Sequence, residues 1–215
     1  EETDMELLEE ILNQNNLNKA YKKVVANKGV AGVDGITVEE EFDYLKENKD
    51  RIINQIRKRK YKPQPVKRVQ IPKENGKMRN LGIPTVTDRI IQQAIFQVIS
   101  PIFEKQFNDN SFGFRPNRSC EQAVVRALEY LNDGYEWIVD IDLEKFFDTV
   151  NQDKLITIIG KTIKDGDVVS LIRKYLSAGV MEKGIVKPTY VGTPQGGNLS
   201  PLLGNIMLNE LDKEL

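Results

Sequence analysis

VKRVQIPKENGKMRNLGI, residues 66–83, alternates apolar and polar side chains on both sides of Glu74-Asn75-Gly76. The pattern predicts a β-hairpin, because successive side chains of a strand point to opposite faces and Asn-Gly favours a tight turn. With a two-residue turn, Lys73 and Arg79 would lie on opposite faces of the hairpin. With a three-residue loop and the glycine at positive φ, Lys73 would pair with Lys77 and share a face with Arg79.

Helical patterns flank the hairpin on both sides. Thr87 caps a segment with apolar residues at helical spacing, and Ser119 with Gln122 forms a capping box for another. Further on we expect a strand at 135–143, helices within 151–176 with a break near Asp165-Gly166, a short β excursion at 179–193, and a last helix from Ser200-Pro201. Helices mixed with antiparallel strands indicate an α+β fold.

The composition is that of a folded domain, with 40% hydrophobic and 29% charged residues among 215. Its net charge of −1 hides a strong asymmetry. Residues 57–79 carry ten Lys or Arg against one acid, Glu74, whereas residues 1–15 carry six acids and no base. Such a basic block is typical of proteins that bind a phosphate-bearing partner, although a solvated charged surface fits the charge alone equally well.

What the sequence lacks excludes several classes of protein. Without histidine the chain has no Ser-His-Asp or Cys-His mechanism, and its composition argues against a zinc site. The single cysteine, Cys120, rules out an intrachain disulfide and fits a reducing compartment. No apolar run approaches the ~20 residues that span a bilayer, and the acidic start is unlike a signal peptide. We therefore expect a location inside the cell, in the cytoplasm or the interior of an organelle.

The stretch VDIDLEKFFDTV, residues 139–150, places acids in an apolar setting. On a strand, Asp140 and Asp142 would share one face, ~6.5–7 Å apart, and that face must meet water or a metal because an unpaired buried carboxylate is costly. A tight turn after Leu143 would bring Phe147 to the floor of a pocket, while Asp148 fits a cap for the next helix. Acids before such a turn suit Mg²⁺, but solvated acids on an edge strand are the commoner case.

Five blocks of the chain occur in the order and spacing of one family. They are GVAGVDGIT (29–37), IPKENGKMRNLGIPTVTDRIIQQAI (71–95), FGFRPNRS (112–119), DIDLEKFFD (140–148) and GTPQGGNLSPLLGNI (192–206). On these blocks, and over nearly its whole length, the chain resembles the reverse transcriptases encoded by group II introns, the intron maturases. The resemblance implies an α+β fold with the fingers and part of the palm of a right-hand polymerase.

The resemblance also implies functional residues for Mg²⁺ and dNTP. Asp142 matches the first catalytic Mg²⁺ ligand, with the Leu143 carbonyl as a second, and Phe147 matches the aromatic under the incoming sugar. Lys73 and Arg79 match the cations that hold the triphosphate, and Gln195 with Gly196 lies in the block near the sugar. Since both cations would contact one triphosphate, we expect the three-residue hairpin loop. The residues expected to bind RNA phosphates are Arg57, Lys58, Arg59, Lys60, Lys62, Lys67 and Arg68.

A division of the chain follows from the resemblance. It comprises an N-terminal extension (1–36), fingers (37–132), a palm strand with the first catalytic Asp (133–150), a fingers/palm insertion (151–195) and a palm helix (196–215). The family's Tyr-X-Asp-Asp block is absent, since the sequence has no Asp-Asp. We therefore expect this chain to bind group II intron RNA, RNA template and DNA primer without polymerising. Uncovered apolar surface would favour a homodimer, and no membrane association is expected.

The sequence also allows two other functions. Asp140-Ile141-Asp142 is a D-x-D pattern such as many glycosyltransferases use to hold a metal and a nucleotide sugar, but these enzymes require a preceding Rossmann-like βαβ order. A non-enzymatic RNA-binding scaffold is the second alternative, and it would use the N-terminal helices, the 29–37 loop and the basic 57–79 segment.

Overall fold

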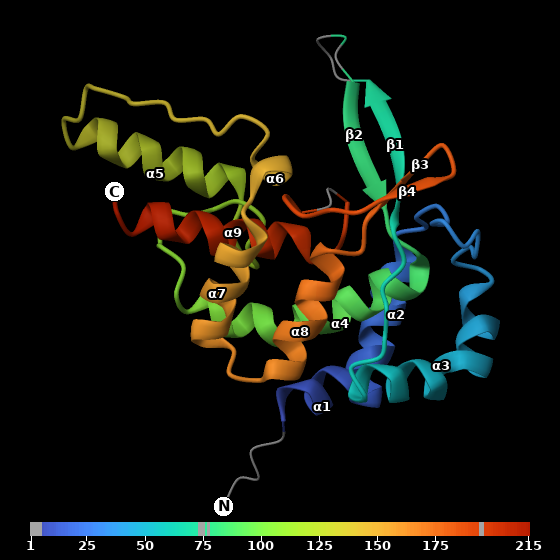
Figure 1. Cartoon of the computed structure of the whole chain (residues 1–215). Coiled ribbons are helices and arrows are strands. Elements are labelled where there is room, and N and C mark those ends of the chain that lie inside the picture. The colour runs from blue at the N-terminus through green and yellow to red at the C-terminus, as the bar shows by residue number, and fades with distance from the viewer. Residues whose placement is uncertain (1–5, 73–75, 77, 194–195) are drawn as a thin grey trace, which may run out of the picture.

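The computed structural model describes residues 6–72, 76, 78–193 and 196–215, so Lys73 and Gln195 lie outside the described residues. In chain order the elements are α1 (Leu7–Leu12), α2 (Gln14–Ala26), α3 (Glu41–Arg57), β1 (Val66–Pro72), β2 (Met78–Ile83), α4 (Val86–Glu104), α5 (Cys120–Asn132), α6 (Phe146–Thr149), α7 (Gln152–Thr162), α8 (Gly166–Leu176), β3 (Val180–Glu182), β4 (Ile185–Lys187) and α9 (Ser200–Asp212). Figure 1 shows a body of helices from which the β1–β2 hairpin projects. The predicted α+β class is confirmed.

Helix α4 is the centre of the helical body. It contacts α1, α2, α3 and α9, and Ala94, Ile95 and Ile99 are fully buried along it. A helix that is apolar around most of its circumference is stable only when other elements surround it. Its cap is Thr85, whose hydroxyl accepts from the Asp88 amide at 3.1 Å, and not Thr87 as the sequence predicted. Thr87 instead donates its hydroxyl proton to buried Glu41, so a tertiary contact occupies the side chain.

The predicted hairpin is confirmed, and the pairing of its described strand residues is in register with the expected three-residue loop, of which only Gly76 lies within the described residues. Strands β1 and β2 are antiparallel, with Ile71 opposite Arg79 and Pro72 opposite Met78, and Gly76 has a φ of +76°. The sheet order is β2-β1-β3-β4, in which β3 pairs with β4 as a second antiparallel hairpin. Strand β3 joins β1 in parallel through Val66 and Val180, which ties the two hairpins together.

Several local predictions in the second half are also confirmed. The capping box at Ser119 and Gln122 begins α5, with the reciprocal hydrogen bonds in place. Helices α7 and α8 are separate, and Asp165 caps α8 through the Asp167 and Val168 amides. The β excursion forms β3 and β4, and the last helix begins at Ser200.

The predicted strand at 135–143 is wrong. Among the described residues this segment has no helix or strand assignment, and it runs as a coil past α5 (Figure 1). Trp137 is 94% exposed and Ile138 is 81% exposed. A strand needs a hydrogen-bonding neighbour, and the described strands pair only with one another, so the alternating pattern has no ladder to join. Consequently the palm strand expected within 133–150 is not formed.

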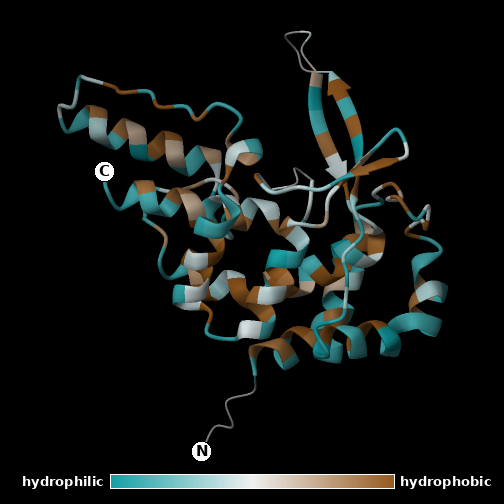
Figure 2. Cartoon of the chain, viewed as in Figure 1, coloured by the Kyte–Doolittle hydropathy of each residue, from teal (hydrophilic) through white to brown (hydrophobic). Residues whose placement is uncertain are grey.

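Helix α5 shares this exposure. It has no buried residue, although its apolar side carries Val124, Leu128 and Leu131, and Figure 2 shows apolar colour along it and along the coil that follows. No helix in the described part of the chain is both long and apolar enough to span a bilayer.

Candidate functional site

A tight turn presents the aromatic pair of the DIDLEKFFD block. Lys145 adopts the left-handed conformation, with φ +51°, and the four-residue helix α6 follows at once. The rings of Phe146 and Phe147 meet edge to face at 5.3 Å. Phe147 rests on α9, since a Cβ added to Gly204 would lie 3.1 Å from its Cε1 atom. The predicted turn is therefore confirmed, and α9 supports the aromatic side chain from below.

The loop that leads into the GTPQGG block is hydrogen-bonded to this turn. The Thr193 amide donates to the Phe147 carbonyl at 2.7 Å, and the Gly192 amide donates to the Val150 carbonyl at 2.8 Å. Gly192 has φ +86°, and a Cβ there would lie 2.8 Å from the Phe147 carbonyl oxygen. Only glycine permits this conformation and this close approach of two backbones.

A cavity of about 310 Å³ lies between the turn, this loop and one face of the β1–β2 hairpin. Its lining is Val66, Arg68, Asn80, Gly82, Phe147, Asp148, Val180, Thr189, Val191, Gly192 and Thr193. It thus combines a guanidinium, a carboxylate and an amide with an aromatic ring, a set suited to a polar ligand that carries a phosphate and a ring. Asp148 belongs to this lining and does not cap the next helix, because Asn151 caps α7.

Arg79 lies on the other face of the hairpin. It is opposite Ile71, and alternation places both away from the face of Arg68 and Asn80 that lines the cavity. Gly196 contacts this part of β2, since a Cβ there would overlap the Gly82 carbonyl oxygen and lie 3.3 Å from Leu81, a residue of the Arg79 face. The hairpin therefore separates the Arg68 cavity from the side that Arg79 occupies.

The residues expected to bind Mg²⁺ form only part of a metal site. Asp142 and Leu143 lie in the exposed coil that leads into α6. A carboxylate and a carbonyl oxygen are donors that Mg²⁺ prefers, but they supply two of the roughly six oxygens it needs. Among the described residues, no three acidic, histidine or cysteine side chains cluster as a metal site would require.

The basic segment lies on the surface and is anchored from beneath. All seven cations predicted to bind RNA are exposed or partly exposed. Arg57 forms a bidentate pair with Glu9 at 2.7 and 2.6 Å, and Arg59 pairs with Asp167. Between them and the hairpin, buried Tyr61 donates to Asp88 at 2.7 Å, a contact that the sequence did not reveal. Burial raises the pKa of Asp88 above its usual value.

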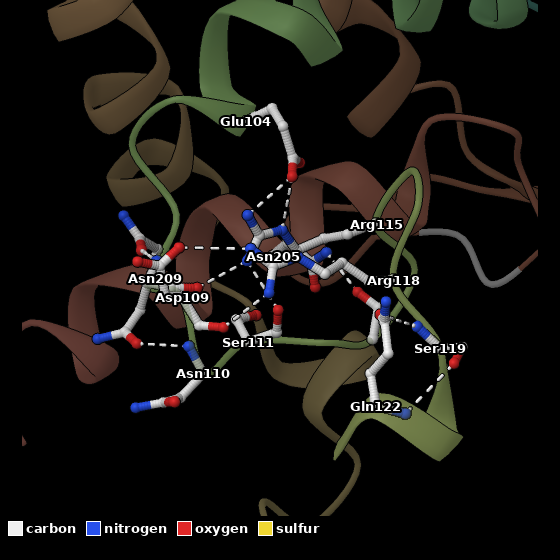
Figure 3. A network of polar contacts seen from close by, with 12 residues as sticks. Glu104, Asp109, Asn110, Ser111, Arg115, Arg118, Ser119, Gln122, Asn205 and Asn209 are labelled. Carbon is white, nitrogen blue, oxygen red and sulfur yellow. Dashed lines mark hydrogen bonds and ion pairs between the residues drawn. The ribbon is translucent and has the colours of Figure 1, made fainter. Parts of the chain in front are cut away.

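The FGFRPNRS block is built around a buried arginine (Figure 3). Arg115 pairs with Glu104 at 2.7 Å and donates to the carbonyl oxygens of Asn108 and Ser111. Asn205 of α9 donates to the Gly113 carbonyl at 2.8 Å. The block therefore joins the end of α4 to α9 and positions the start of α5.

The GVAGVDGIT block packs against the start of α4. Arg89 donates to the Val30 carbonyl at 2.6 Å, and a Cβ at Gly32 would lie 2.7 Å from the Thr85 backbone. Beneath this loop, Glu41 is fully buried, and burial raises its pKa to about 7. The sequence showed a glycine-rich loop here but neither buried Arg89, which donates to it, nor buried Glu41, which accepts from Thr87.

Comparison with known proteins agrees with this arrangement. A family model described as reverse transcriptase (RNA-dependent DNA polymerase) matches residues 71–215. A chain of a solved partial Cas6-RT-Cas1–Cas2 complex superposes with a TM-score of 0.65 at 22% identity, covering 99% of this chain and 35% of its own, and this likeness concerns the fold alone. The chain belongs to the reverse transcriptase family.

Its relatives by sequence include a group II intron-encoded protein and an intron maturase. The group II intron-encoded protein LtrA of Lactococcus lactis subsp. cremoris is 44% identical over 90% of this chain and 32% of its own length. Protein YkfC of Escherichia coli K12 is 38% identical over 93% and 54%. The mitochondrial nuclear intron maturase 2 of Arabidopsis thaliana is 30% identical over 59% and 22%. The family predicted from the five blocks is confirmed, and the chain spans about a third to a half of the first two relatives.

The glycosyltransferase alternative finds no support. The described residues before Asp140 contain an antiparallel hairpin among helices, where a nucleotide-sugar enzyme would need a βαβ order.

Proposed function

We propose that this chain is the nucleotide- and RNA-binding part of a group II intron reverse transcriptase, an RNA-directed DNA polymerase that also binds its intron RNA to assist splicing and mobility. The observation that carries the proposal is the packing of Phe147 and Asp148 against Gly192 and Thr193 beside a polar cavity closed by the hairpin. The names of the relatives, an intron-encoded protein and an intron maturase, support the branch.

In this proposal each element of the site has a role. Asp142 and the Leu143 carbonyl would contribute two ligands to one Mg²⁺, and that ion would supply charge neutralisation for phosphoryl transfer. Phe147 lies under the sugar of the dNTP and excludes a 2′-hydroxyl. Lys73 and Arg79 are proposed to hold the triphosphate, which must then extend past the hairpin, because Arg79 lies on the hairpin face opposite the cavity lining. Gln195 and Gly196 are proposed to lie near the sugar. The proposed division of the chain is that expected from the resemblance, except that 133–150 is an extended palm segment. The other parts are the N-terminal extension (1–36), fingers (37–132), insertion (151–195) and palm helix (196–215).

The basic segment is proposed to bind RNA. Its cations face solvent while Tyr61 and Asp88 hold the backbone, so the charges are presented on a rigid support. Arg57 and Arg59 have acidic partners, and RNA phosphates would have to compete with these carboxylates. Intron RNA, RNA template and DNA primer are the proposed partners, in the cytoplasm or an organelle where such RNA occurs.

Fluorescence anisotropy across a salt series tests the RNA-binding role. The chain is titrated against a structured group II intron RNA and an unrelated RNA of equal length. We expect tight binding whose logarithm falls linearly with the logarithm of salt, by about 0.7–0.9 per phosphate contacted. Replacing Lys58, Lys60 and Lys62 with Ala should lower the slope by roughly 3. Weak binding that does not respond to salt would contradict the proposal.

The polymerase role is tested by primer extension. We expect no dNTP incorporation by the chain alone, because Asp142 and Leu143 do not complete a two-metal donor set. Incorporation by the isolated chain would contradict this division of the site. In the complete enzyme, Lys73→Ala should lower dNTP incorporation much more than RNA affinity. If this chain served only as an RNA-binding scaffold, Lys73→Ala would leave dNTP incorporation unchanged.

A further inference from the structure

Gln152 is a buried side chain that joins three parts of the chain. It is the first residue of α7, and its Nε2 donates to the Leu176 carbonyl at 3.0 Å and to the Gly192 carbonyl at 2.9 Å. Both N–H groups of the amide are therefore used. Leu176 ends α8, so its carbonyl has no partner within the helix. The Thr189 hydroxyl donates to the same oxygen at 2.8 Å, so the start of the 189–192 loop is also bonded to this helix end.

Gly192 is consequently held at both of its backbone polar groups. Its N–H donates to Val150, two residues before Gln152, and its carbonyl accepts from the Gln152 side chain. The next residue, Thr193, donates its N–H to the Phe147 carbonyl. Gly192, Thr193 and Phe147 all line the cavity of the candidate site. Gln152 does not line that cavity, so it reaches the site only through the loop it holds.

We propose that Gln152 is a positioning residue for the incoming nucleotide, which it serves by holding the Gly192–Thr193 wall at a set separation from the Phe147 turn. This inference rests on the proposed function of the cavity. Without the amide, the Leu176 carbonyl keeps the Thr189 hydroxyl as a donor, but the buried Gly192 carbonyl loses the Gln152 donor, and a buried unpaired carbonyl drives local rearrangement. The loop is then free to withdraw from the turn, and the wall that contacts the nucleotide is displaced.

The test is steady-state primer extension by the complete reverse transcriptase that contains this chain. Gln152→Met keeps the side-chain volume and removes both donors, so it isolates the hydrogen bonds. We expect the KM for dNTP to rise about tenfold while kcat changes less than threefold, as loss of nucleotide binding requires. Gln152→His retains one ring N–H donor, and we expect a KM between those of Gln152→Met and the unmodified enzyme.

Gln97→Met is the matched control. Gln97 also donates two hydrogen bonds from Nε2, to the carbonyl and the side-chain oxygen of Asn16 at 3.1 and 2.7 Å, but it joins α4 to α2 away from the cavity. Both Met variants should lose stability in thermal denaturation, whereas only Gln152→Met should raise the KM for dNTP. Equal KM values for the two variants would overturn the positioning role.

Two further outcomes keep the inference separate from the function it rests on. If Gln152→Met does not fold, the His variant decides, and a KM equal to that of the unmodified enzyme overturns the inference. If the unmodified enzyme incorporates no dNTP on a primed RNA template, the proposed function itself fails, and the inference about Gln152 fails with it. Hydrogen exchange of the Thr193 amide should accelerate in Gln152→Met, because its acceptor and its loop are no longer held together.

Discussion

Buried charged residues hold the functional blocks in place. Glu41 and Arg89 lie under the 29–37 block, Asp88 anchors the basic segment through Tyr61, and Arg115 joins the FGFRPNRS block to α4. Such groups are costly to bury unless partners compensate them, so each is sensitive to a single substitution. Stability and the shape of the site are therefore directly linked through these buried residues.

Glu41 predicts an unusual dependence of stability on pH. Burial raises its pKa from 4.5 to about 7, so between those values the folded chain holds a proton that the unfolded chain releases. Stability should therefore fall as pH rises from about 4.5 to about 7, by up to about 3 kcal/mol. Glu41→Gln keeps an acceptor for the Thr87 hydroxyl, removes the charge and should be more stable at pH 8 but little changed at pH 4.5.

Urea denaturation at the two pH values measures this effect. Exposed Glu39→Gln is the control and should show no difference between them. An equal effect of Glu41→Gln at both pH values would show that the carboxyl does not titrate in this window.

Arg115→Ala should be among the most destabilising single substitutions. It removes the partner of Glu104 and leaves the Asn108 and Ser111 carbonyls without their donor. Breaking a buried pair in this way costs about 3–5 kcal/mol. Arg118→Ala, which breaks the pair with highly exposed Asp109, should cost about 0–1 kcal/mol. Guanidinium denaturation of both variants provides the comparison, and equal midpoints would contradict it.

Elements of this chain are joined where backbones approach closely. The 189–193 loop lies against α6, the 29–36 loop lies against the start of α4, and β3 lies beside β1. At the first two contacts a glycine fills the gap because a Cβ would overlap the neighbouring backbone. The shape of the site therefore depends on these contacts between elements and not on any one element.

Two glycines separate the effect of close approach from that of backbone conformation. Gly184 and Gly192 both have positive φ, of +81° and +86°, but only Gly192 has a neighbour within reach of a Cβ. Gly184→Ala should cost about 1 kcal/mol through its conformation. Gly192→Ala should cost about 3 kcal/mol or more, because the loop must also move away from Phe147. Thermal denaturation measures both, and equal losses would mean that the contact is not tight.

Large apolar side chains are buried in one part of the molecule and exposed in another. The helical body has a continuous core around α4, whereas α5 and the coil at 135–143 carry large exposed apolar side chains. Exposed apolar surface of this kind favours association.

We expect the chain to self-associate through this surface. Sedimentation should show a concentration-dependent shift toward a homodimer or larger species. Leu128→Glu with Leu131→Lys, both exposed on α5, should weaken association without lowering the melting temperature, because neither side chain is buried in the chain. Val30→Glu is the control, because Val30 is an exposed apolar residue in the 29–37 loop, away from α5. A strictly monomeric profile at high concentration would rule out the association.

Local features of the sequence were sufficient for much of the fold. Alternation and a glycine predicted the hairpin, Ser119 with Gln122 predicted the start of α5, and Asp165-Gly166 predicted the break between α7 and α8. Each depends on residues close in sequence, whose backbone preferences act without a distant partner. The family itself was also predictable, because five ordered blocks are specific even when each block is short.

The family, the α+β class and those helix and hairpin boundaries that depend on local caps and turns all follow from the sequence. Long-range packing set the rest. Residues 135–143 form no strand, Thr85 and not Thr87 caps α4, Arg68 and not Arg79 lines the cavity, and Gln152 holds Gly192, 40 residues away. These outcomes depend on which distant segments become neighbours, because a strand, a buried polar group or a cavity wall is stable only with its partner in place.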